Sequence, residues 1–108
     1  MINRSDNPNR RIVDIKDLIR FANEFLFGAI GAGVRAVSTE VQGDKVRWRC
    51  IFETQQAMSL YKPPLEEIES KLRGIFHNHA DVDGEYFIID TKKEMEHLSR
   101  LLFLRYEA

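Results

Sequence analysis

The first regular pattern along the chain is a helical repeat of apolar residues that follows Asp14. From Ile15 to Leu26 the apolar residues recur at helical spacing and charged side chains fall between them, as in an amphipathic helix. Asp14 is placed to cap this helix, and the glycine cluster that begins at Gly28 is expected to end it. The pattern therefore predicts a helix from Ile15 to near Gly28.

The period changes to two after Val34, which is typical of strands. Gln42-Gly43-Asp44 supplies turn residues between two alternating runs, so residues 34–53 are predicted to form a β-hairpin with one buried face. The buried face of its second strand holds Val46, Trp48, Cys50 and Phe52. The opposite face is expected to be open and to bring together three arginines that pair with nearby acids or hold phosphate or carboxylate groups, namely Arg35, Arg47 and Arg49.

A second helical stripe follows two prolines. Pro63 and Pro64 are interpreted as a boundary, with Pro64 in the first turn of the helix. The apolar stripe consists of Leu65, Ile68, Leu72, Ile75 and Phe76. Residues 54–62 match neither period and stay unassigned.

The C-terminal third is more ambiguous. Asp83-Gly84 indicates a turn, and the run from Tyr86 to Ile89 favours a short strand. Thr91-Lys92-Lys93-Glu94 matches a capping box, which predicts a helical turn over 92–99 before a final strand, although one helix over 92–106 also fits. The predicted order is α-β-β-α-β-β. This is an α+β fold with a mainly antiparallel sheet and both helices on one face.

Composition limits the class of protein. The chain has 108 residues, 44% of them hydrophobic, which fits one domain over 12–108 after a flexible lead-in, residues 1–11. No apolar run is long enough to span a membrane, and the N-terminus lacks the apolar region of a signal peptide. A single cysteine, Cys50, excludes an internal disulfide framework. These features predict a cytoplasmic protein.

No motif for catalysis, metal or cofactor binding is found. His77 and His79 are two of only three histidines, whereas a zinc site needs three or four converging ligands. The run Asp81-Val82-Asp83-Gly84-Glu85 departs from the spacing of a calcium loop and is interpreted as an acidic tight turn. Cys50 lies on the apolar hairpin face and is expected to be an inert buried thiol. The protein is therefore predicted not to be an enzyme.

Charge is unevenly placed along the chain. Its net charge is −1, but residues 50–90 hold three basic and eight acidic residues, a balance of −5. A carboxylate array suits a protein that must cover a cationic, nucleic-acid-binding surface. Solvated surface is the alternative interpretation. The candidate binding residues, chosen from charge placement alone, are Glu66, Glu67, Glu69, Asp81, Asp83 and Glu85.

Four segments resemble a known group of proteins. They are Gly33-Val34-Arg35-Ala36-Val37, Asp44-Lys45-Val46-Arg47-Trp48, Pro64-Leu65-Glu66-Glu67-Ile68-Glu69 and the closing Leu104-Arg105-Tyr106-Glu107. Over roughly residues 14–107 the chain resembles small bacterial proteins that include immunity proteins of contact-dependent growth inhibition systems. The resemblance implies a cytoplasmic protein that binds the C-terminal domain of a toxin, in many cases a nuclease. It carries over no site residue, because such interfaces diverge with their partners.

Two other functions stay open at this point. A nucleic-acid-binding module would use Arg35, Arg47, Arg49 and Trp48, but the chain lacks the basic excess typical of such domains. A small ligand-binding or enzymatic domain would need a deep pocket with converging polar groups. The oligomeric state is not predicted.

Overall fold

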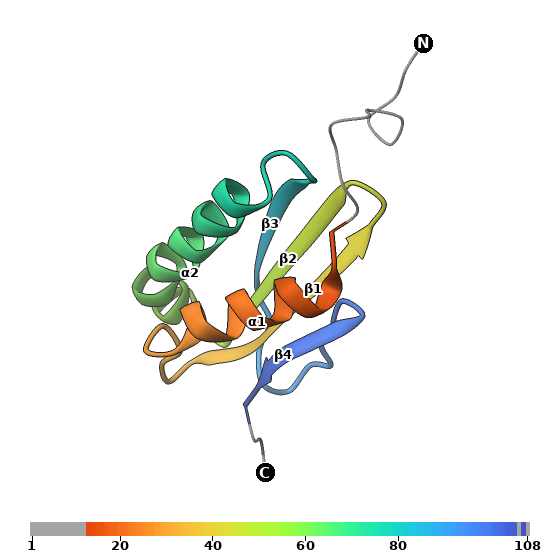
Figure 1. Ribbon diagram of the computed structural model, residues 1–108. Coiled ribbons are helices and arrows are strands. Elements are labelled where there is room, and N and C mark those ends of the chain that lie inside the picture. Colours follow the sequence, from red (N-terminus) through yellow and green to blue (C-terminus); the bar gives the residue numbers. More distant parts are fainter. Residues whose placement is uncertain (1–12, 106, 108) are drawn as a thin grey trace.

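The computed structural model describes residues 13–105 and 107, and in them the predicted order of elements is confirmed (Figure 1). The predicted lead-in, residues 1–11, lies outside the described residues. The elements are α1 (Ile15–Leu26), β1 (Val34–Gln42), β2 (Lys45–Phe52), α2 (Gln55–Ile75), β3 (Asp81–Ile88) and β4 (Arg100–Leu104).

The four strands form one sheet in the order β3-β2-β1-β4. β1 is antiparallel to both β2 and β4, whereas β3 is parallel to β2, because α2 carries the chain back across the sheet between them. Both helices pack on one face, where the fully buried side chains include Trp48, Phe52, Leu18, Leu65 and Leu72. The predicted buried face of the hairpin is therefore confirmed.

The first helix forms as predicted. The Asp14 side chain accepts a hydrogen bond from the Lys16 amide at 2.9 Å, and Leu18 and Ala22 point into the core. Just beyond the helix, Gly28 has a φ of +85°, a backbone conformation that favours glycine.

The prolines do not begin the second helix, which corrects the predicted boundary. α2 begins at Gln55, after Thr54, whose hydroxyl accepts a hydrogen bond from the Ala57 amide at 3.1 Å. The missing amides of Pro63 and Pro64 leave the carbonyls of residues 59 and 60 without helical donors. Both of those residues are exposed, so solvent can satisfy the carbonyls. The helix therefore tolerates two prolines in its interior.

The predicted turn at Asp83-Gly84 is wrong, because both residues lie inside β3. A Cβ atom at Gly84 would overlap the carboxylate of Glu69, a side chain of α2. Glycine therefore lets the helix carboxylate lie directly against the strand backbone. The acidic run that begins at Asp81 is thus an extended segment and not a tight turn.

The predicted helical turn over 92–99 is also wrong. The Arg35 guanidinium donates to the carbonyls of Ile89, Asp90 and Lys93, at 2.9–3.3 Å. Of these, only the Lys93 carbonyl belongs to the predicted helical turn, and the Leu98 amide of the same segment donates to Ser38. Asp90 closes only a local turn, in which its side chain accepts from the Lys92 amide and its carbonyl from the Lys93 amide. The chain then continues without a helix to β4. The predicted final strand is confirmed.

The loop over residues 89–99 crosses the sheet face that the helices leave uncovered. Ser38 accepts a hydrogen bond from the Leu98 amide at 3.0 Å, and Arg49 donates to the Glu96 carbonyl at 3.0 Å. Ala36 and Ile51 are fully buried outside the main core. The face predicted to be open is therefore partly covered, and Arg35 is buried within it.

Candidate functional site

The outer side of β3 is the place where the structure brings several predicted acids near one another. The Asp81 amide donates to the Asp44 carbonyl and the Ile89 amide to the Phe52 carbonyl, both at 2.9 Å and both toward β2. Because peptide groups alternate in direction along a strand, the residues between them with outward amides are Val82, Gly84, Tyr86 and Ile88. We call this row of outward peptide groups the β3 edge. Among the described residues, no strand pairs with it.

Two side chains of α2 lie against the β3 edge. Glu69 accepts a hydrogen bond from the Tyr86 hydroxyl at 2.6 Å, and its side chain is only 13% exposed. Arg73 pairs with Glu69 and donates to the Val82 carbonyl at 3.0 Å. Burial and the hydrogen bond to the Glu69 carboxylate together raise the pKa of Tyr86. Glu69, predicted as a binding residue, is therefore engaged in holding α2 to β3.

Glu85 is also bound by other side chains, on the sheet face opposite α2. Its carboxylate accepts hydrogen bonds from Arg47 at 2.8 Å and from Arg49 at 3.2 Å. Burial alone would raise the pKa of Glu85, but the hydrogen bonds and charges of the two arginines outweigh it and lower the pKa. The expectation that these arginines pair with acids is confirmed.

The other predicted acids are more accessible. Glu66 and Glu67 are exposed on α2, and Asp83 is exposed on β3, while Asp81 is half-buried. Lys71 lies 3.8 Å from Glu67 in an exposed ion pair of little energetic value. Within the described part of the chain, neither Glu66 nor Asp83 has an ion pair.

The six predicted acids thus do not form one continuous patch. Alternation along β3 places Asp83 on the sheet face opposite α2, which carries Glu66. Helix α2 flanks the β3 edge on one face (Figure 1), where the Glu69 carboxylate lies against Gly84.

A second ionic cluster, which the sequence pattern did not indicate, holds the C-terminal segment. Arg35 makes a bidentate pair with Glu107 at 2.7 and 2.8 Å, and Arg105 bridges Glu107 and Glu53. Hydrogen bonds from Arg35 and then Arg105 lower the pKa of Glu107 to about 2. The C-terminal segment Leu104-Arg105-Tyr106-Glu107 contains half of this cluster. The spacing of residues in the sequence did not indicate that Glu107 pairs with Arg35.

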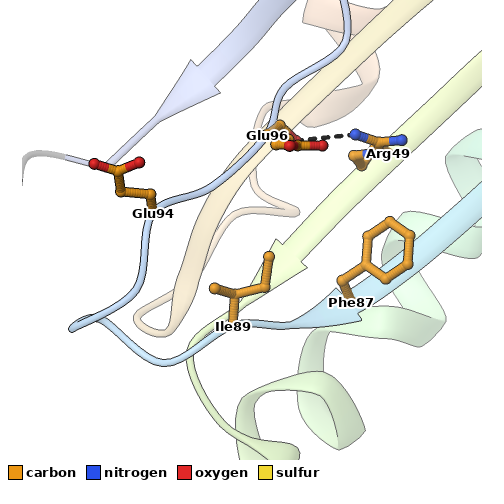
Figure 2. Close-up of a pocket in the computed structure, with 5 residues that line it drawn as sticks. All are labelled: Arg49, Phe87, Ile89, Glu94 and Glu96. Carbon is orange, nitrogen blue, oxygen red and sulfur yellow. Dashed lines mark hydrogen bonds between the residues drawn. The ribbon is translucent and has the colours of Figure 1, made fainter.

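A shallow hollow of about 350 Å³ lies beside the end of β3, on the face that the loop crosses. Figure 2 shows Phe87 and Ile89 on one side of it and the loop carboxylates Glu94 and Glu96 on the other. The Arg49 guanidinium lies 5.3 Å from the centroid of the Phe87 ring. The hollow therefore combines an aromatic ring, the cation that lies over it and two carboxylates.

Three residues were considered for other chemistry from the sequence: Trp48 for base stacking, Cys50 as a thiol and His77 as a metal ligand. Trp48 is fully buried and cannot stack on a base, and burial raises the pKa of the Cys50 thiol. Nδ1 of His77 lies 3.0 Å from the Gly74 carbonyl. In the described ranges, no cluster of three or more His, Cys, Asp or Glu residues is arranged to hold a metal ion. None of the described helices has the length and apolar character needed to cross a membrane.

A family match places this chain in a class of proteins, the immunity proteins of bacterial toxin systems. The chain is a member of the MafI2 immunity protein family, whose family model matches residues 15–107. Membership implies that its binding partner is a cognate toxin protein. A search of curated proteins gives no match.

Proposed function

We propose that this protein binds the C-terminal nuclease domain of a cognate toxin in the cytoplasm and thereby protects the cell that makes it. The family match over residues 15–107 is the observation that carries the proposal. Contact-dependent growth inhibition is the proposed delivery route, in agreement with the sequence resemblance.

The acidic side chains favour a nuclease as the partner. Phosphate contacts dominate the affinity of nucleases for their substrates, so their clefts are basic. Of the six acids predicted as binding residues, the exposed ones are Glu66 and Glu67 on α2 and Asp83 on β3. We propose that these residues contact the basic surface of the toxin. Glu69 and Glu85 act indirectly, by fixing α2 and the sheet in place.

The proposal is tested with the toxin domain encoded in the neighbouring reading frame, purified as a catalytically inactive variant. Glu66→Lys and Glu67→Lys should each weaken binding, mainly by slowing association, because exposed charges steer the encounter. Glu24→Lys is the matched control, since Glu24 is an exposed acid on α1 without an ion pair in the described residues. The Kd and the association rate are measured by surface plasmon resonance, and folding is checked by circular dichroism.

Protection of cells that express the active toxin completes the test. The parent protein should protect, and the double variant of Glu66 and Glu67 should protect less well than the Glu24 control. Equal affinity of all three variants would refute the acidic contact surface. Failure of the parent protein to bind or protect would refute the immunity function for this toxin.

A further inference from the structure

The β3 edge is a row of backbone hydrogen-bonding groups with no partner strand in the described part of the chain. Natural proteins usually blunt such an edge with charged side chains, prolines, bulges, very short strands or a covering segment. Of these devices β3 has only charged side chains, and it pairs with β2 in unbroken register over all eight of its residues. Arg73 covers only the first outward carbonyl, that of Val82.

The end of the β3 edge is also apolar. Phe87 and Ile88 are 40% and 43% exposed, and they point to opposite faces of the sheet. A strand added alongside β3 would cover part of both side chains at once. A partner that touched one face alone would cover only one of them.

The charges beside the edge select the kind of strand that can be added. Asp81, Asp83 and Glu85 alternate along the sheet face opposite the helices. Glu85 is already paired with Arg47 and Arg49, whereas Asp83 is exposed and has no ion pair among the described residues. In an added strand, the residue directly opposite Asp83 would have its side chain beside that carboxylate, where an opposite charge stabilises and a like charge destabilises the pair. A lysine or arginine at that position therefore complements this edge.

A second copy of this chain is a poor occupant. Residues with outward peptide groups must pair with one another, so the acidic faces of two antiparallel copies would be continuous. In the two registers that overlap nearly the whole strand, either Asp83 faces Glu85 of the copy or the two Glu85 side chains face each other. Glu85 is already paired with Arg47 and Arg49, so the like charge that opposes self-pairing comes mainly from Asp83.

We infer that the toxin binds by adding an extended segment with a basic residue opposite Asp83 to the β3 edge, so that the sheet continues into the partner. This inference rests on the proposed immunity function and specifies the contact. The added segment hydrogen-bonds to the outward peptide groups of Gly84, Tyr86 and Ile88. Its basic side chain lies beside Asp83.

Amide exchange tests the added strand directly. The inactive toxin domain from the neighbouring reading frame is bound to the full-length protein, and exchange is followed residue by residue by NMR. The amides of Gly84, Tyr86 and Ile88 should exchange at least about tenfold more slowly in the complex, because new hydrogen bonds protect them. Unchanged exchange at these amides in a stable complex would overturn the inference while leaving the immunity function intact.

A proline substitution tests the same hydrogen bonds by affinity. Ile88→Pro removes an outward amide without removing a hydrogen bond to β2, and Ile88→Ala is the matched control that keeps the amide. The proline variant should bind the toxin about tenfold more weakly than the alanine variant, the effect of one lost hydrogen bond with its unsatisfied partner. Equal affinities of the two folded variants would overturn the inference. The exchange experiment on the parent protein decides the question if the proline variant does not fold.

The charge of the added segment has its own test. Asp83→Lys should weaken toxin binding about tenfold relative to Glu24→Lys, since it places a cation beside the basic segment. Equal affinity of these variants would refute a basic segment. If the parent protein does not bind the toxin domain at all, the proposed function fails, and the inference fails with it.

Discussion

The Tyr86 hydroxyl donates a hydrogen bond to the Glu69 carboxylate at 2.6 Å and so joins the outermost strand to the helix that covers it. Arg73 completes the contact by pairing with the same carboxylate and with the Val82 carbonyl. This arrangement fixes the β3 edge relative to α2. The edge is therefore a preformed surface, and binding to it requires little ordering of the chain.

Tyr86→Phe should destabilise the protein, because it leaves the largely buried Glu69 carboxylate with one hydrogen-bonding partner fewer. Hydrogen bonds to charged groups contribute about 1.5–3 kcal/mol, and a loss in that range is expected in the free energy of unfolding in urea. Tyr61→Phe is the control, since the Tyr61 hydroxyl has no hydrogen bond within the described residues. Equal stability of the two variants would show that the Tyr86 contact contributes nothing.

Two glycines should respond to alanine in opposite directions. Gly84→Ala would place a Cβ against the Glu69 carboxylate, which must then move and weaken its contacts with Tyr86 and Arg73, so the melting temperature should fall. Gly74 lies inside α2 with open space around it, and Gly74→Ala should stabilise the helix by about 0.5–1 kcal/mol. Thermal unfolding of both variants checks the pair. A neutral Gly84→Ala would contradict the close approach of Glu69.

The sequence pattern predicted the elements that local periodicity determines. The apolar stripe of α1 and the alternation of apolar and polar residues in the hairpin were sufficient to predict these elements, because burial of one face imposes those periods. The first half of α2 was not predicted, because Pro63 and Pro64 were interpreted as the start of the helix although its apolar stripe continues before them. Ala57 and Leu65 both lie on the buried side of this helix, and Thr54 caps it. The capping residue Thr54 was the sequence signal that could have located the start of α2.

The remaining errors have long-range causes. A capping box favours a helix over residues 92–99, but Arg35 binds the Lys93 carbonyl and Ser38 accepts from the Leu98 amide, and both partners lie more than 50 positions away in the chain. The predicted acids illustrate the same limit. Charge placement identified Glu69 and Glu85 as acidic, but only the tertiary structure shows that distant residues engage both carboxylates. Accessible and engaged carboxylates look alike in a sequence.

Trp48→Ala should cost about 3–5 kcal/mol, because Trp48 is the largest fully buried side chain and its removal leaves a cavity in the core. A loss of that size is a large fraction of the stability of a small domain. Urea unfolding, followed by circular dichroism, measures the difference. A melting temperature within a degree or two of the parent protein would contradict the packing of the sheet against the helices.

The Glu107 cluster should make stability depend on pH at the acid end. The pKa of Glu107 falls from an ordinary 4.5 to about 2 in the folded protein, chiefly through Arg35. The stability that this shift contributes is present above pH 4.5 and is lost as the pH falls toward 2. The difference in free energy of unfolding between the parent and Glu107→Gln should therefore shrink across this window. A difference that stays constant from pH 6 to pH 2 would contradict the ion pair.

The acids beside the β3 edge should keep the isolated protein from pairing with itself. Asp83→Val removes an exposed carboxylate and adds a residue that favours strands, so two edges can meet with less repulsion. Sedimentation velocity should find the parent protein monomeric and the Asp83 variant associating as its concentration rises. Glu24→Val on α1 is the control and should remain monomeric, since it adds an apolar residue away from any strand edge. An Asp83 variant that stays as monomeric as the control would show that charge does not guard this edge.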